Sequence, residues 1–218
     1  MIRTYTAADH NALIDLFERA SENSPSGELW RHPPSQRMVY LDPYVDSCPD
    51  TLFLAEVDGE LVGYLTGCPD SAMIPPEDER ITDAIARHRV FLKARSLPFF
   101  GRSMVDLMTA KLRGADVSGG EVVDPSFPAH LHINLVPQAR GTGAAQDLMS
   151  AWMGWLARAD SPGCYLQTLV ENTRAVRLFE KCGFVTYGST PRVPGVRYSG
   201  RSVHQQTMIW RPTEADKG

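Results

Sequence analysis

Apolar and polar residues alternate over residues 51–57 and 60–66, on either side of the dipeptide Asp58-Gly59. Two period-two stretches joined by an Asp-Gly turn predict a β-hairpin. The same alternation returns over residues 130–136, and shorter strand-like stretches lie at residues 2–6, 164–170, 185–189 and 203–210. Residues 191–201 contain two prolines and two glycines, so we expect an irregular arm there.

Helical periodicity is well marked in two places. Thr6 and Asp9 have capping-box spacing, and the apolar residues that follow have the i, i+3, i+4 spacing of a buried helix face; they are Leu13, Leu16, Phe17 and Ala20. A second amphipathic helix is predicted directly after Gly143, with its apolar face made by Leu148, Met149, Trp152, Trp155 and Leu156. The pattern of strands and helices predicts an α/β fold.

Residues 69–128 separate the third predicted strand from the fourth. A first helix is expected to start at residues 75–79, with acidic residues first and basic residues later, which complements the helix dipole. A second helix is expected over residues 102–113 and ends at Gly114; Met104, Val105, Leu107, Met108 and Leu112 are predicted to face inward. We interpret this region as a helical insertion over the sheet, because it is too short for a core of its own.

Composition excludes several functions. The 218 residues are 43% hydrophobic, enough for one domain spanning residues 1–218, and the net charge of −4 with no long basic run argues against a nucleic-acid partner. No apolar run reaches the roughly 18 residues of a membrane span, so we expect no membrane partner. The start of the sequence has no signal-peptide pattern, and four scattered cysteines without a CxxC pair favour reduced thiols in the cytoplasm.

The most informative stretch is a strand, a turn with two glycines, and a helix start, in the order His130–Val136, Arg140-Gly141-Thr142-Gly143 and Ala144. This order predicts an anion site, because first-turn N–H groups lack helical partners and the helix dipole is positive there. A P-loop requires Lys-Ser/Thr after its last glycine, where this chain has Ala144-Ala145. A dinucleotide loop requires three glycines, and only two are present.

The segment Gln138-Ala139-Arg140-Gly141-Thr142-Gly143-Ala144 resembles the pyrophosphate loop of the GNAT superfamily of acyl-CoA N-acyltransferases. The later residues Asn172, Ala175, Phe179, Gly183 and Phe184 match the superfamily's Asn-x-x-Ala helix ending in Gly-Phe. The resemblance implies a mixed, mostly antiparallel sheet flanked by helices, with the helical insertion between the third and fourth strands. The long insertion followed by Phe127-Pro128 and its strand is similar in layout to the acetyltransferase-like domain of O-GlcNAcases and its bacterial relatives.

The resemblance also implies which residues bind acetyl-CoA, the expected co-substrate. In the superfamily the strand before the loop diverges from the next strand, and the pantetheine arm pairs there with main-chain groups. The residues implied are Asn134, Leu135 and Val136 on the strand, Gln138, Arg140, Gly141, Thr142, Gly143, Ala144 and Ala145 in the loop, and Asn172 and Phe179 beyond it. Asn172 has an alternative role as a helix N-cap.

The catalytic groups follow less directly from the resemblance. Many members have a tyrosine where this chain has Phe179, and that tyrosine protonates the departing thiolate. A thiol of pKa about 8.5 leaves tolerably without such help. His132, on the strand before the loop, is our candidate general base, and an ordinary hydrogen-bonded histidine is the alternative.

These features predict an acetyl-CoA-dependent N-acetyltransferase that acts on an amine of a small molecule or peptide. A catalytically silent module that binds acetyl-CoA or CoA is the alternative, and a scaffold whose insertion blocks the cleft is a third. Trp30, Arg31 and His32, after the first helix, are candidate acceptor contacts or simple loop anchors. Exposed apolar residues in the insertion would suit a homodimer.

Overall fold

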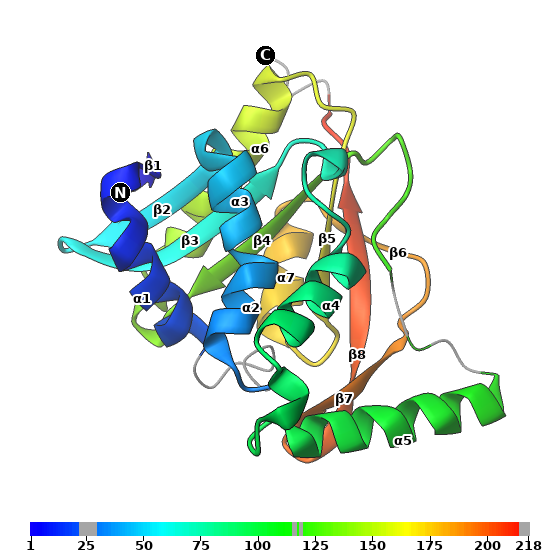
Figure 1. Ribbon diagram of the computed structural model, residues 1–218. Coiled ribbons are helices and arrows are strands. Elements are labelled where there is room, and N and C mark those ends of the chain that lie inside the picture. The colour runs from blue at the N-terminus through cyan, green and yellow to red at the C-terminus, as the bar shows by residue number, and fades with distance from the viewer. Residues whose placement is uncertain (22–29, 115–116, 118–119, 214–218) are drawn as a thin grey trace.

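The computed structural model describes residues 1–21, 30–114, 117 and 120–213, which form an eight-stranded mixed sheet with helices on both faces (Figure 1). The sheet order is β1-β2-β3-β4-β5-β8-β6, and β7 pairs with β8 outside this path. The strands are β1 (Ile2–Thr4), β2 (Leu52–Val57), β3 (Glu60–Cys68), β4 (Ala129–Leu135), β5 (Cys164–Leu169), β6 (Val185–Tyr187), β7 (Arg192–Tyr198) and β8 (Arg201–Trp210). Only β4 and β5 pair in parallel, so the predicted mixed, mostly antiparallel sheet is confirmed.

Helices cover the sheet in two layers. The α-helices are α1 (His10–Ser21), α2 (Pro33–Tyr40), α3 (Asp42–Ser47), α4 (Glu77–Arg87), α5 (Leu97–Arg113), α6 (Ala144–Arg158) and α7 (Thr173–Lys181). In Figure 1, α1 to α4 lie in front of the sheet, and α6 and α7 lie behind it. The rear layer is packed tightly, because a Cβ atom added at Gly67 of β3 would lie 2.4 Å from the Trp152 ring of α6.

The first helix and the hairpin form as their local signals predict. Asp9 accepts hydrogen bonds from the Thr6 N–H at 2.9 Å and the Thr6 hydroxyl at 2.8 Å, and the predicted apolar face of α1 is buried. Strands β2 and β3 meet at Asp58 and Gly59, which both have positive φ. The register shifts between the pairs Ala55–Gly63 and Glu56–Leu61, so Val62 is the extra residue of a β-bulge beside Gly63.

The insertion contains α4 and α5, but the predicted inward face of α5 is wrong. Met104, Val105, Leu107, Met108 and Leu112 are all exposed, and Asp106 and Ala110 are buried instead. Asp106 faces β7, where its carboxylate binds Arg197 at 2.7 Å and Arg192 at 3.0 Å and accepts the Gly195 N–H at 2.9 Å. These polar contacts, and not the apolar stripe, fix the orientation of α5.

The long arm expected at residues 191–201 is largely strand β7, and its pairing with β8 is irregular between Arg192 and Arg197. Pro194 lies within β7, which has a partner strand on one side through β8. An edge strand tolerates a proline, because the missing N–H faces away from the ladder. The prolines and the glycine of residues 21–34 predict a loop after α1, and residues 22–29 of it fall outside the described residues.

Candidate active site

The sheet splits between β4 and β5. These strands pair only at Ala129 with Cys164 and at His130 with Tyr165, and β5 then continues as a partner of β8. The β5-facing edge of β4 is therefore left without a strand partner from Leu131 onward. The predicted divergence of the two strands is confirmed, and an extended ligand could pair with this edge as an added strand would.

The hydrogen bonds at the end of β4 decide which main-chain groups face the split. The Val136 N–H donates to the Val62 carbonyl at 2.9 Å, and the Val136 carbonyl accepts from the Ala139 N–H at 3.0 Å. Because residues of an antiparallel ladder alternate in the direction of their bonds, we infer that the main chain of Asn134 also faces β3 and that of Leu135 faces the split. Of the three predicted contributors, Leu135 is the one directed at the split.

The glycine-bearing loop has the geometry of an anion cradle. Gly141 and Gly143 have φ of 79° and 83°, a region that glycine occupies without strain. Gly143 is the N-cap of α6, and Ala144 and Ala145 are its first residues. Within the described residues, the N–H groups of Gly141, Gly143 and Ala145 have no hydrogen-bond partner. These donors, with the exposed side chains of Gln138, Arg140 and Thr142, surround the positive end of the helix dipole.

The two predicted contacts beyond the loop occupy different environments. Asn172 is exposed and caps α7, because its side-chain oxygen accepts the Ala175 N–H at 3.3 Å. The N-cap alternative is therefore observed, and the side-chain NH2 group is not used by this cap. Phe179 is buried in the hydrophobic core with its ring 6.1 Å from that of Phe184, and it offers no hydroxyl to a leaving thiolate.

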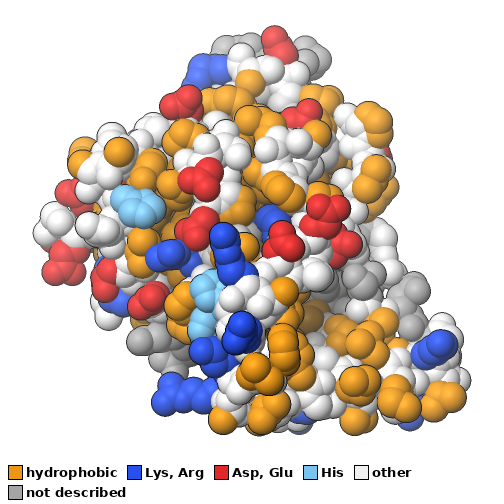
Figure 2. Space-filling view, viewed as in Figure 1, with side chains coloured by type: hydrophobic (Ala, Val, Ile, Leu, Met, Phe, Trp, Pro, Cys, Tyr) orange, Lys and Arg blue, Asp and Glu red, His pale blue; other side chains and the backbone are white. Residues whose placement is uncertain are grey.

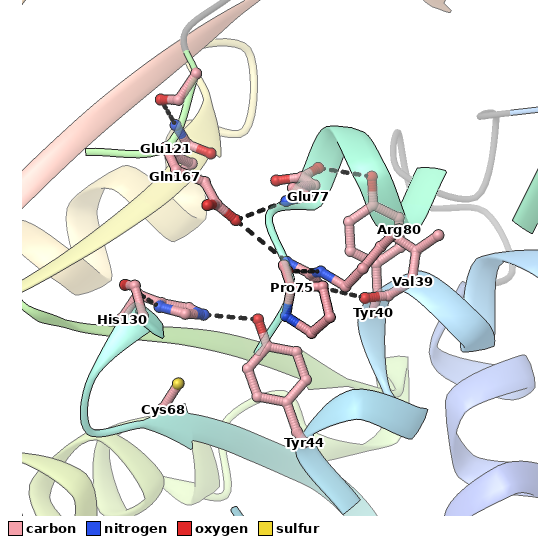
Figure 3. A network of polar contacts seen from close by, with 12 residues as sticks. Val39, Tyr40, Tyr44, Cys68, Pro75, Glu77, Arg80, Glu121, His130 and Gln167 are labelled. Carbon is pink, nitrogen blue, oxygen red and sulfur yellow. Dashed lines mark hydrogen bonds and ion pairs between the residues drawn. The ribbon is translucent and has the colours of Figure 1, made fainter. Parts of the chain in front are cut away.

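His130 is held by hydrogen bonds at both ring nitrogens (Figure 3). Its Nδ1 lies 2.8 Å from Ser71 Oγ, and its Nε2 lies 2.8 Å from the Tyr44 hydroxyl. Ser71 Oγ also donates to the Pro128 carbonyl at 2.9 Å. The arrangement that satisfies every contact has Nδ1–H donating to Ser71 and Tyr44 donating to Nε2. Burial lowers the pKa of His130, so the ring is neutral and fully used.

His132 lies two residues further along β4 on the same face, and its ring contacts aromatic side chains. The centroids of the Tyr44 and Tyr40 rings lie 5.4 Å and 5.8 Å from that of His132, both edge-on. No hydrogen bond to its ring nitrogens is found in the described part of the chain. Burial, reinforced by the positive charge of Arg80, lowers the pKa of His132 to about 4. His132 is therefore a neutral imidazole whose lone pair is not consumed by the protein.

Two charged residues of the insertion lie beside the tyrosines of this cluster: Glu77 bonds Tyr40, and Arg80 lies over the ring of Tyr44 (Figure 3). Arg80 is 6% exposed; it donates to the Pro75 carbonyl at 2.8 Å and to the Val39 carbonyl, and it lies 3.3 Å from Glu121. Glu77 accepts from the Tyr40 hydroxyl at 3.0 Å, and burial raises the pKa of its carboxyl. Tyr40 thus connects the Glu77 carboxyl, from a segment outside the sheet, to the aromatic surroundings of His132.

The sequence did not indicate the aromatic part of this site. Tyr40 and Tyr44 lie on α2 and α3, which were not predicted, although prolines at the start of each helix are a usual N-terminal signal. Trp30 and His32, predicted to be acceptor contacts or loop anchors, stabilise the start of α2, as the second alternative expects. Trp30 is buried and donates to Ser35 Oγ at 2.7 Å, and His32 is the N-cap; Arg31 is exposed beside them.

Other candidate sites in the described residues offer fewer reactive groups. A surface pocket of about 370 Å³ lies between α5 and the start of β7, lined by Arg113, Arg192 and His204 among others, and it shares no residue with the His132 cluster. The described residues contain no group of His, Cys, Asp and Glu side chains arranged to hold a metal ion. The split beside His132 is therefore the site with the most complete set of reactive and binding groups.

Comparisons with known proteins agree with this geometry. The sequence model of the acetyltransferase (GNAT) family matches residues 118–184, which include β4, the loop, α6, β5 and α7. A putative acetyltransferase from Salmonella typhimurium, solved with its cofactor acetyl-CoA, has the same fold: TM-score 0.57 at 14% identity, covering 98% of this chain and 94% of that chain.

Two further solved structures are similar over nearly their whole lengths. A ribosomal-protein-alanine N-acetyltransferase from Brucella melitensis gives a TM-score of 0.56 at 18% identity, covering 97% of this chain and 99% of that chain. A polyamine N-acetyltransferase from Drosophila melanogaster gives 0.58 at 18% identity, with coverages of 97% and 99%. The chain therefore has the fold of these acetyltransferases, and its residues 118–184 match the sequence model of the GNAT family.

Proposed function

We propose that this protein is an acetyl-CoA-dependent N-acetyltransferase that acetylates an amine of a small molecule or peptide by direct transfer. The observation that carries the proposal is the neutral, unbonded imidazole of His132 beside the split between β4 and β5. Three neighbours at known GNAT positions support it: the loop amides, the Leu135 main chain and Asn172. The proposal includes a cytoplasmic location and a nearer likeness to the acetyltransferase-like domain of O-GlcNAcases.

In the proposed binding mode, the pyrophosphate of acetyl-CoA lies against the N–H groups of the loop and the side chain of Arg140. Positive charge at the start of α6 favours an anion there. The Leu135 main chain pairs with the pantetheine amides and places an N–H near the thioester oxygen, where negative charge develops. The Asn172 NH2 group is free to donate to the same arm.

The acceptor enters from the α2 and α4 side as a neutral amine, after a protonated form has lost one proton to water. Its nitrogen lone pair attacks the thioester carbon, a C–N bond forms, and the C–S bond breaks as the thiolate leaves. His132 takes the proton released by the nitrogen and passes it to water, and the thiolate takes a proton from solvent. Because burial lowers its pKa to about 4, His132 is unprotonated throughout the neutral range.

A silent acetyl-CoA-binding module remains the second candidate, favoured by Phe179. This side chain is buried and cannot protonate sulfur, so the leaving thiolate has no acid at the position that many GNAT enzymes use. Turnover separates the two candidates, because a silent module binds acetyl-CoA and releases no thiol in the presence of amines.

Calorimetric titration with acetyl-CoA tests the binding half of the proposal. We expect the wild type to bind and Gly143→Asp to lose binding, because the variant places a carboxylate and a strained side chain in the cradle. Gly188→Asp is the matched control, since Gly188 has a φ of 73° and open space around it away from the loop. Failure of the wild type to bind would overturn both candidates.

Thiol release with a panel of amines tests the chemical half. His132→Gln should bind acetyl-CoA as the wild type does and lose roughly 10²- to 10⁴-fold in kcat, the usual contribution of a general base. An unchanged rate in this variant would remove His132 from the mechanism, and absence of thiol release by the wild type with every amine would favour the silent module.

A further inference from the structure

Exposed apolar side chains gather in one part of the insertion. Of the fifteen large hydrophobic side chains exposed in the described chain, eight lie between residues 91 and 112. They are Phe91, Leu92, Leu97, Met104, Val105, Leu107, Met108 and Leu112, with exposed fractions from 46% to 85%. Patches of this kind on a folded protein mark interaction sites.

The geometry of α5 arranges most of these side chains in a stripe. At 3.6 residues per turn, Leu97, Met104, Met108 and Leu112 lie along the side of α5 opposite Asp106, whose carboxylate is bonded to β7. In Figure 1, α5 runs along the lower edge of the molecule and extends beyond the sheet. The stripe thus lies on the side of α5 that is turned away from β7.

The same segment carries a strong positive charge. Residues 87–113 contain seven Lys and Arg residues and one acidic residue, Asp106, so their net charge is +6 in a chain of net charge −4. Six of the seven are exposed, namely Arg87, Arg89, Lys93, Arg95, Lys111 and Arg113. Figure 2 shows basic and hydrophobic side chains together along the lower edge of this face. The single acid is already neutralised by Arg192 and Arg197.

We propose that residues 87–113, the basic ridge, dock the protein on an anionic lipid bilayer. The exposed apolar side chains of α5 and of Phe91 and Leu92 enter the headgroup region, and the surrounding Lys and Arg side chains meet lipid phosphates and carboxylates. No helix in the described ranges is long and apolar enough to cross a membrane. A helix that lies in the plane of the surface needs no such run, so this inference departs from the sequence expectation of no membrane partner.

Charge argues against a second copy of the chain as the occupant of this ridge. A two-fold dimer built on antiparallel α5 helices would place Lys111 and Arg113 of each copy against Lys93 and Arg95 of the other. Like charges brought together in this way weaken the contact, whereas an anionic surface complements all of them at once. The ridge also lies outside the split and its loop, so docking and acetyl-CoA binding can be tested separately.

Vesicle sedimentation of the full chain tests the proposal. We expect binding to vesicles of phosphatidylcholine mixed with phosphatidylserine, little binding to pure phosphatidylcholine, and loss of binding as salt rises from about 0.1 M to about 1 M, where the screening length falls to roughly 3 Å. Equal binding to neutral and anionic vesicles, or no binding to either, would overturn it. This salt series uses the wild type and does not depend on any variant folding.

Two variants, each with a matched control, test whether residues of the basic ridge contact the vesicles. Lys111→Glu should weaken binding to anionic vesicles by about tenfold, because each basic residue near such a surface contributes on the order of fivefold and the change reverses a charge. Arg158→Glu is the control, since Arg158 is an exposed basic residue in the last turn of α6, as Lys111 is in α5. An equal loss of vesicle binding in both variants would show that net charge alone sets the binding, and it would contradict the proposed surface.

Met104→Gln/Met108→Gln removes apolar area from the ridge and keeps helix-forming residues. Binding to anionic vesicles should fall severalfold, and Val185→Gln, at an exposed apolar residue of β6, should leave it unchanged. Light scattering tests the alternative that a second copy of the chain covers the ridge. A wild-type dimer that becomes a monomer in the double methionine variant would show that a second copy covers the ridge, and it would overturn the membrane proposal.

Discussion

The Tyr44 hydroxyl lies 2.8 Å from Nε2 of His130, so a helix preceding the first hairpin is bonded to the strand that borders the split. Both side chains are buried, and His130 also bonds Ser71, which fixes its tautomer. Tyr44 contacts His132 through its ring and His130 through its hydroxyl. One residue thus contacts both histidines of β4.

Tyr44→Phe should therefore destabilise the protein by about 1–3 kcal/mol, because it leaves the buried Nε2 of His130 without a donor. Urea unfolding gives the change in the free energy of unfolding. Tyr198→Phe, which removes a hydroxyl from an exposed tyrosine, should change it by less than about 0.5 kcal/mol. Equal stability of the two variants would show that the His130 contact contributes nothing.

Stability should fall as the solution is acidified below pH 6.5. The pKa of His132 is lowered from 6.5 to about 4 by burial, so between these values the unfolded chain binds a proton that the folded chain does not. The free energy of unfolding then falls by about 1.4 kcal/mol per pH unit for this group, and it is unaffected above pH 6.5. His130, whose pKa is also lowered, acts in the same direction.

His132→Gln should make this dependence shallower by about 1.4 kcal/mol per pH unit when urea unfolding is repeated between pH 7 and pH 5. His10→Gln removes an imidazole from an exposed position and serves as the control. An unchanged slope in His132→Gln would mean that His132 titrates in the folded protein much as it does in the unfolded chain.

Gly67→Ala should be strongly destabilising. The added methyl group would lie 2.4 Å from the Trp152 ring, and overpacking of a core costs about 1–3 kcal/mol or prevents folding. Gly101→Ala, on the exposed side of α5 with open space around it, should stabilise by about 0.5–1 kcal/mol through helix propensity. Thermal melting of both variants should show shifts of opposite sign.

Asp106→Asn should destabilise by about 3 kcal/mol or more, because Arg192 and Arg197 lose a buried counter-charge and α5 loses its attachment to β7. Asp15→Asn is the matched control, as the Asp15–Arg19 pair is exposed and such pairs contribute at most about 0.5 kcal/mol. A small loss in Asp106→Asn would mean that apolar contacts hold α5 in place.

The sequence predicts the elements whose signals are local. Asp58-Gly59 defines the hairpin and Gly143 the start of α6, because positive φ at particular positions is a property of neighbouring residues. The face of α5 could not be predicted in this way. Periodicity shows which side of a helix is apolar, whereas burial depends on the bond from Asp106 to Arg197, ninety-one residues away along the chain.

The candidate site also has one part predicted from contiguous residues and one part that depends on the folded structure. The loop from Gln138 to Ala145 is read from contiguous residues, and the structure gives it unpaired amides at a helix start. The surroundings of His132 come from Tyr40, Tyr44, Glu77 and Arg80, on helices that meet only in the folded chain. A local sequence pattern predicts the conformation of the loop, whereas the surroundings of His132 depend on packing between distant segments.

The split between β4 and β5 also divides the hydrogen-bonded ladder of the sheet in two. Two residue pairs of strand pairing join the part containing β1 to β4 to the part containing β5, β8 and β6. Side-chain packing connects the rest, because one hydrophobic core spans both parts and Trp152 Nε1 of α6 donates to Cys164 Sγ of β5 at 3.5 Å. A ligand lying along the Leu135 edge would therefore complete the sheet where packing alone connects its two parts.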